Sequence, residues 1–190
     1  MSVVYEKLMT CLESIQKKVN FKPEVALILG SGLGDYADDI QIEATVEYSE
    51  IDGFPVSTVP GHKGRFVFGY VDKTPVVIMQ GRVHYYEGYP MSDVVLPTRL
   101  MGMLGAKKLI LTNAAGGINF EFQPGDFMML TDHITTAIPS PLIGANLDEL
   151  GPRFPDMSQV YSVRMQDIIR KNAEEMGITL REGVYVQLTG

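Results

Sequence analysis

An apolar run that passes directly into a dense polar cluster dominates the middle of the sequence. Val76-Val77-Ile78-Met79 is β-branched and apolar, which is the composition of a buried strand. Residues 80–90 follow at once and hold an arginine, a histidine, tyrosines and a glutamate. Open α/β sheets place their ligands at the carboxyl ends of strands. The pattern therefore predicts a ligand site at the end of this strand, and the alternative is a polar turn that only caps it.

The polar cluster has the chemistry of an anion and sugar site. Arg82 offers a permanent planar fork suited to an oxyanion, and His84 can donate to the same anion or exchange a proton near neutral pH. Glu87 can fix the tautomer of a nearby histidine, while the face of a tyrosine can pack on a sugar or a base.

Composition limits the partners of the chain. Its 190 residues, 45% of them hydrophobic, can bury the core of a single domain spanning 1–190. A net charge of −7 argues against nucleic acid as the main partner. An anionic substrate must then be held by a local cluster of donors, because the field of the whole protein does not attract it.

Cysteine use and hydropathy indicate a cytoplasmic protein. A single cysteine, Cys11, allows no intramolecular disulfide, which is consistent with a reducing compartment. We see no apolar run of membrane-spanning length and no signal-peptide core at the N-terminus, so we expect no membrane partner.

Apolar periodicity predicts alternating helices and strands, the pattern of an α/β fold. We expect helices over 2–19, 92–104 (interrupted by Pro97) and 159–176 (capped by Ser158), and strands over 25–29, 65–71, 75–80, 108–112, 127–131 and 184–188. The stretch 139–155 is expected to be a large irregular loop.

Two further strand ends carry small residues. In Gly30-Ser31-Gly32-Leu33-Gly34 the backbone N–H groups can form an anion nest to which Ser31 adds a hydroxyl. This loop is neither a Walker loop nor a dinucleotide fingerprint, so a plain tight turn stays open beside phosphate binding. Asn113-Ala114-Ala115-Gly116-Gly117 is equally compatible with an exposed backbone site and with close packing of a strand on a helix.

The three histidines do not indicate a metal site. His62 lies in a glycine-flanked loop that presents its imidazole, and a plain surface histidine is the alternative there. His62, His84 and His133 show no spacing of metal ligands, so we expect no metal. Asp132-His133 at the end of a strand is ambiguous, because satisfying buried backbone groups is enough to explain it, and we leave it outside the site.

Four motifs in order resemble the trimeric purine nucleoside phosphorylases. They are Gly30-Ser31-Gly32-Leu33-Gly34, Val59-Pro60-Gly61-His62, residues 79–90 and Thr112-Asn113-Ala114-Ala115-Gly116-Gly117. The resemblance implies an α/β fold in which helices flank a mixed, distorted sheet in three layers, and a homotrimer. It implies a glycosyltransferase of nucleoside salvage that cleaves purine (deoxy)ribonucleosides with inorganic phosphate as co-substrate and needs no cofactor.

The resemblance also assigns residues. It implies a phosphate site of Ser31, His62, Arg82, His84 and the backbone of Ala114. It implies a nucleoside site of Tyr86, Ala115, Gly116 and Phe154, the last reaching into the sugar pocket of a neighbouring subunit. His84 and Glu87 are the implied catalytic pair.

The sequence departs from the family pattern in two places. It stops at Gly190, where the family continues into the residues that read the purine, so we expect a C-terminally incomplete member without inosine cleavage of its own. The residues after Asp132-His133-Ile134 also differ from the family's usual ones. The sequence does not decide whether the preferred base is a 6-oxopurine or a 6-aminopurine.

Two alternative functions remain. One is a methylthioadenosine phosphorylase, although those enzymes usually carry threonine where Ser31 stands. The other is an inactive fragment that retains only phosphate binding or a subunit interface.

Overall fold

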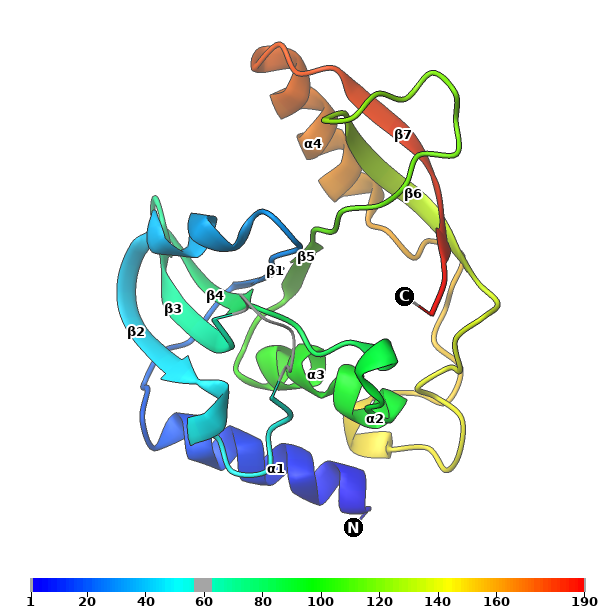
Figure 1. Cartoon of the computed structure of the whole chain (residues 1–190). Coiled ribbons are helices and arrows are strands. Elements are labelled where there is room, and N and C mark those ends of the chain that lie inside the picture. The colour runs from blue at the N-terminus through cyan, green and yellow to red at the C-terminus, as the bar shows by residue number, and fades with distance from the viewer. Residues whose placement is uncertain (1, 57–62, 190) are drawn as a thin grey trace. The chain divides into compact units, whose positions relative to one another are not determined.

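The computed structural model describes residues 2–56 and 63–189 and divides the chain into two compact units. The first unit extends to Ala114, and the second runs from Ala115 to Thr189 (Figure 1). Each unit has a sheet of its own. This division into compact units does not test the expectation of a single domain over 1–190, which stays a prediction.

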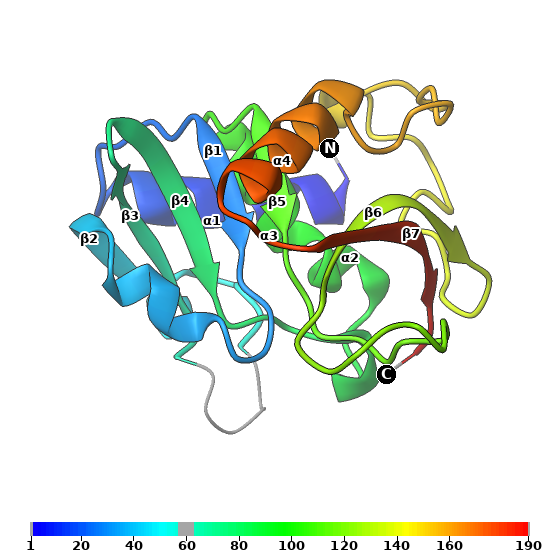
Figure 2. The ribbon, with the colours of Figure 1, turned by 90° about the horizontal axis from the view of Figure 1, so that it is seen from above.

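The first unit contains a five-stranded mixed sheet in the order β2-β3-β4-β1-β5 (Figure 2). Its strands are β1 (Val25–Ile28), β2 (Gln41–Glu47), β3 (Arg65–Val71), β4 (Thr74–Gln80) and β5 (Lys108–Leu111). β2, β3 and β4 form an antiparallel meander, whereas β1 pairs in parallel with both β4 and β5. The carboxyl ends of β4, β1 and β5 therefore lie next to one another at one edge of the sheet.

The centre of this sheet is buried on both faces. Val77 and Ile78 point to opposite faces of β4, and each is 0% exposed. Strands covered on both faces have nearly continuous apolar sequences, which is why β4 has no polar alternation. On the face of Ile78, a cluster with Val67 and Val76 packs under Ala37 of the 3-10 helix η1 (Gly34–Asp38).

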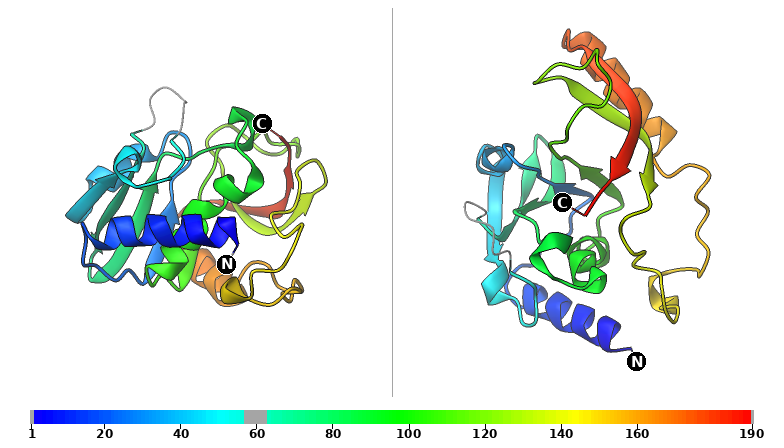
Figure 3. Two further views of the ribbon diagram at one scale, coloured as in Figure 1. Left: turned by 90° about the horizontal axis from the view of Figure 1, so that it is seen from below. Right: turned by 45° about the vertical axis from the view of Figure 1, so that its right-hand side comes forward.

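Helices α1 (Val3–Gln16) and α3 (Leu96–Met103) pack together on one face of the same sheet (Figures 1 and 3). The Ser2 hydroxyl caps α1 by accepting from Tyr5 N at 3.3 Å. A stripe at helical spacing on α1 is buried and comprises Leu8, Cys11, Leu12 and Ile15. The expected interruption at Pro97 is confirmed: α2 (Met91–Val94) ends before it, and Pro97 occupies the first turn of α3, where a missing N–H costs little.

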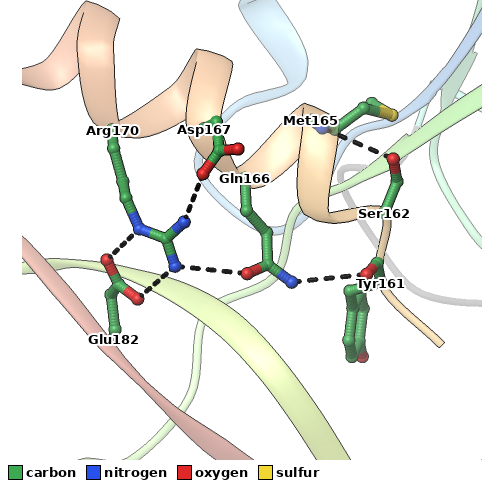
Figure 4. Close-up of polar contacts among 7 residues, drawn as sticks. All are labelled: Tyr161, Ser162, Met165, Gln166, Asp167, Arg170 and Glu182. Atoms are coloured by element: carbon green, nitrogen blue, oxygen red, sulfur yellow. Dashed lines mark hydrogen bonds and ion pairs between the residues drawn. The ribbon is translucent and has the colours of Figure 1, made fainter. Parts of the chain in front are cut away.

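The second unit is a βαβ arrangement. β6 (Phe127–Thr135) and β7 (Leu180–Gln187) pair in parallel, and α4 (Val163–Glu175) lies between them in the chain. Arg170 of α4 binds both carboxylate oxygens of Glu182 at 2.7 Å and Asp167 Oδ1 at 2.9 Å (Figure 4). This bidentate pair ties the helix to β7. Within 139–155 the described structure has only one short 3-10 turn, η4 (Asp148–Leu150), so the expected irregular loop is confirmed.

Three expectations about the elements were wrong in detail. β2 was not predicted, although Ile42, Ala44 and Val46 alternate with polar residues in it, and most residues of this edge strand are exposed. The cap of α4 is Ser162, whose hydroxyl accepts from Met165 N, whereas Ser158 N donates to Asp156 Oδ1 in a preceding turn. β6 and β7 are longer than predicted, since each strand satisfies the backbone of the other along its length.

Candidate functional site

Thr112, directly after β5, links the ends of three strands. Its hydroxyl accepts from Gly30 N at 2.8 Å and donates to Ile28 O at 3.1 Å, both at the end of β1. Its carbonyl lies 3.4 Å from Arg82 Nη1, which follows β4. The loops after β1, β4 and β5 therefore meet around one threonine.

Only glycine fits at position 30, because the backbone of Thr112 and Asn113 passes directly beside it. A Cβ atom on Gly30 would lie 2.5 Å from Thr112 O and 2.6 Å from Asn113 Cα, closer than any side chain can approach backbone. Gly32 has φ +82°, and Leu33 N donates to Gly30 O, which closes a tight turn. Ser31 is exposed at the tip of that turn. The tight turn is therefore present and leaves Ser31 open to solvent, while phosphate binding by this loop stays a prediction.

Glu87 orients His84. Glu87 ends the 3-10 turn η3 (Tyr85–Glu87), and its Oε1 lies 2.9 Å from His84 Nδ1 and accepts from His84 N at 2.7 Å. The Glu87 side chain is only 2% exposed and that of His84 19% exposed. A buried carboxylate against Nδ1 selects the tautomer that carries its hydrogen there. The expected contact between Glu87 and a nearby histidine is present, and the fixing of the tautomer stays a prediction.

An exposed aromatic surface lies beside His84. The ring of Tyr86 stacks on the imidazole with centroids 4.8 Å apart and planes 19° from parallel, and Tyr86 is 58% exposed. An open tyrosine face of this kind can pack on a flat or apolar ligand surface.

The first unit holds four of the predicted phosphate residues, and the structure brings them to adjacent strand ends. They are Ser31, Arg82, His84 and Ala114. Ala114 is exposed, and its carbonyl accepts from Asn113 Nδ2 at 3.2 Å. His62, the fifth, lies outside the described residues.

The other predicted nucleoside residues belong to the second unit. Ala115 and Gly116 are exposed at its start. Phe154 is 88% exposed, with the guanidinium of Arg153 5.9 Å from its ring centroid. Arg153 also donates to two loop carbonyls, Leu142 O at 2.9 Å and Gly144 O at 2.7 Å. Phe154 is thus presented outward by a loop that its neighbour braces.

Three residues near the strand ends were not predicted as part of the site. Thr112 and Gln80 belong to predicted strands and motifs but were given no role, and Tyr48 lies outside every motif. Gln80 is 2% exposed and Tyr48 0%, and both hydrogen-bond to backbone of the predicted loops. The sequence marks Gln80 only as a polar residue at the end of an apolar strand, and its burial and partners appear only in the structure.

Among the described residues, no group of three or more histidine, cysteine, aspartate or glutamate side chains could hold a metal ion. Within the same residues, no helix is long and apolar enough to span a membrane. His133, left outside the predicted site, has a buried Nδ1 with no hydrogen-bond partner, while its backbone N donates to Asp132 Oδ1 at 2.8 Å.

The protein is of the mixed α/β class. Loops of small residues follow β1 and β5, and a loop that carries Arg82 follows β4 between them in the chain. Residues 24–190 match the model of the Phosphorylase superfamily, and the chain belongs to that superfamily. Purine nucleoside phosphorylase 1 of Geobacillus stearothermophilus is 50% identical over 93% of this chain and 64% of its own length. Purine nucleoside phosphorylase 1 of Bacillus subtilis is 47% identical over 93% of this chain and 65% of its own length.

A solved structure gives the same result for the fold. The chain matches isoform 2 of the Schistosoma mansoni purine nucleoside phosphorylase, crystallised with cytosine and ribose-1-phosphate, with a TM-score of 0.90 at 39% identity. The match covers 100% of this chain and 68% of that one. The expected fold, a mixed sheet flanked by helices, is confirmed. The chain spans a little under two thirds of the length of the two bacterial relatives.

Proposed function

We propose that this chain is part of a purine nucleoside phosphorylase. The enzyme would cleave purine ribonucleosides or deoxyribonucleosides, such as inosine and guanosine, with phosphate to give free base and (deoxy)ribose 1-phosphate. The observation that carries the proposal is the meeting of the Gly30, Arg82 and Thr112 loops at three adjacent strand ends. The names of the bacterial relatives support it.

The phosphate would bind where these loops meet. Ser31 supplies a hydroxyl, Ala114 a backbone N–H, and Arg82 a planar cation that stays charged at every working pH. His62 and His84 complete the proposed set of donors. Such a local cluster is what a chain of net charge −7 requires to hold an anion.

Bound phosphate would act on the sugar as nucleophile and as counter-charge. As the C1′–N9 bond breaks, its electron pair leaves with the purine, which takes up a proton, and oxocarbenium character develops on the ribose. A phosphate oxygen beneath C1′ stabilises that charge and then forms the new C–O bond. One fixed donor of this kind contributes roughly 3 kcal/mol, and holding the two reactants together contributes on the order of 7 kcal/mol or more.

The remaining residues would position the sugar and the base. Glu87 holds His84 in one orientation toward the phosphate and sugar, and the Tyr86 ring lies against the ribose. Ala115 and Gly116 leave room beneath purine and ribose. Phe154 would complete the sugar pocket of a neighbouring subunit, so we propose a homotrimer. We further propose a cytoplasmic enzyme of nucleoside salvage that uses no cofactor or metal.

The test is a phosphorolysis assay on the protein purified from its native host, with its intact mass measured alongside. Inosine, guanosine and methylthioadenosine compete in one reaction, and the 190-residue chain is assayed in parallel. We expect the native protein to consume inosine and guanosine only when phosphate is present. Preferential use of methylthioadenosine would identify the related enzyme instead. Phosphate binding without cleavage of any nucleoside would leave only a phosphate-binding fragment.

A further inference from the structure

Gln80, the last residue of β4, is buried and uses both ends of its amide. Its Nε2 donates to Gly34 O at 2.6 Å, at the end of the loop that presents Ser31. Its Oε1 accepts from Arg65 Nε at 2.7 Å. The side chain is 2% exposed in an otherwise apolar strand. A buried amide costs free energy unless it is hydrogen-bonded, so an apolar residue would serve the core equally well.

Tyr48 holds the next peptide of the same strand end. Its ring is 0% exposed, and its hydroxyl donates to Gly81 O at 2.7 Å, directly before Arg82. Burial raises the pKa of Tyr48 well above its usual value, so the hydroxyl stays protonated and remains a donor. Tyr48 N donates to Gly64 O at 2.8 Å, and Gly64 N donates to Gln80 O at 3.0 Å, which closes a backbone link around Gln80 and Gly81.

The two side chains thus act on the two loops that carry phosphate donors. Two hydrogen bonds fix the Ser31 loop. At its start Gly30 N donates to Thr112 Oγ1, and at its end Gly34 O accepts from Gln80 Nε2. Arg82 follows the peptide that Tyr48 binds. A donor displaced by about 1 Å loses much of its effect on a reacting group.

We infer that Gln80 and Tyr48 are positioning residues of the phosphate site: Gln80 fixes the Ser31 loop relative to β4, and Tyr48 fixes the peptide that leads into Arg82. The inference rests on the proposed function, because it requires phosphate to bind at these loops. Neither side chain needs to touch the phosphate itself.

The experiment is calorimetric titration of the native-length protein with inorganic phosphate, together with urea unfolding of every variant. Gln80→Glu keeps an acceptor for Arg65 but removes the donor to Gly34 O, and Tyr48→Phe removes only the hydroxyl. Ile78→Val is the matched control, since it loosens the core of the same strand but removes no hydrogen bond to a loop. We expect about five- to tenfold weaker phosphate binding in Gln80→Glu and Tyr48→Phe and an unchanged Kd in Ile78→Val.

A double-mutant cycle shows whether Gln80 acts through Ser31. In a Ser31→Ala background, Gln80→Glu should weaken phosphate binding by a clearly smaller factor than in the unmodified chain. Equal factors in the two backgrounds would overturn the assignment of Gln80. Unchanged phosphate affinity in Gln80→Glu and Tyr48→Phe, or losses matched by Ile78→Val, would overturn the whole inference while leaving the proposed function intact. No phosphate binding by the unmodified chain would overturn both.

Discussion

The carboxylate of Glu87 holds His84 at two points. One oxygen, Oε1, lies 2.9 Å from the imidazole Nδ1 and 2.7 Å from the backbone N of the same histidine. Backbone and ring are thereby locked to each other across a single 3-10 turn. The orientation of the imidazole at the proposed phosphate site is set by a residue only three positions further along the chain.

The first prediction concerns this pair. Glu87→Gln keeps the shape of the side chain but removes the charge and lets the amide present a donor to Nδ1, which favours the wrong tautomer. We expect kcat for phosphorolysis by the native-length protein to fall roughly tenfold or more. Glu174→Gln, an exposed position on α4, is the control and should leave kcat unchanged. Equal kcat values for Glu87→Gln and the control would remove Glu87 from the site.

The second prediction concerns Arg82. Arg82→Ala removes the only permanent cation proposed for the phosphate, so phosphorolysis should slow by roughly two to three orders of magnitude with a higher KM for phosphate. Arg82→Lys should recover part of the loss, because a point charge cannot reproduce a planar fork. The measurement is initial-rate kinetics at varied phosphate. Unchanged kinetics in a folded Arg82→Ala protein would refute the role.

The third prediction concerns Phe154 and assembly. Its ring is 88% exposed, and we propose that it completes the sugar site of a neighbouring subunit. Phe154→Ala should therefore weaken nucleoside binding more than phosphate binding. Phe120→Ala is the matched control, since that side chain is even more exposed than Phe154. Equal loss of both ligands, or a fully active monomer in sedimentation, would exclude a shared site.

The fourth prediction concerns Cys11. Burial raises the pKa of its thiol from 9.0 to about 11. At pH 8 the folded chain should react with a thiol reagent far more slowly than the urea-unfolded chain, because the thiolate is the reactive form. The unfolded thiol ionises first as pH rises above 9.0, so this group's contribution to stability is present below that pH and declines through about 11. Rapid labelling of the folded chain would show that Cys11 is not buried.

The strands whose ends carry the predicted site could be predicted from sequence because their signals are local. A β-branched run such as Val76-Val77-Ile78-Met79 marks a buried strand, and the small residues after β1 and β5 mark the points where these strands end in loops. The prediction that Ser158 caps α4 was wrong because two serines precede this helix. Only the turn in which Ser158 N donates to Asp156 decides between them.

The roles of Gln80 and Tyr48 could not be read from sequence. Gln80 meets Gly34 and Tyr48 meets Gly81, across 46 and 33 residues of chain respectively. These contacts exist only once the meander β2-β3-β4 has paired and the η1 turn has packed on it. Local patterns show which side chains are polar, but the tertiary fold decides which backbone groups they satisfy.

The central claim is that the ends of β1, β4 and β5 bind phosphate. A nuclear magnetic resonance titration of the isotope-labelled chain with inorganic phosphate tests it residue by residue. The account predicts saturable shifts of the backbone amides of Ser31 and Ala114 and of the Arg82 guanidinium, with Lys73, in the turn before β4, unaffected. Saturation at other residues with these three signals unmoved, or the absence of any saturable shift, would contradict the account.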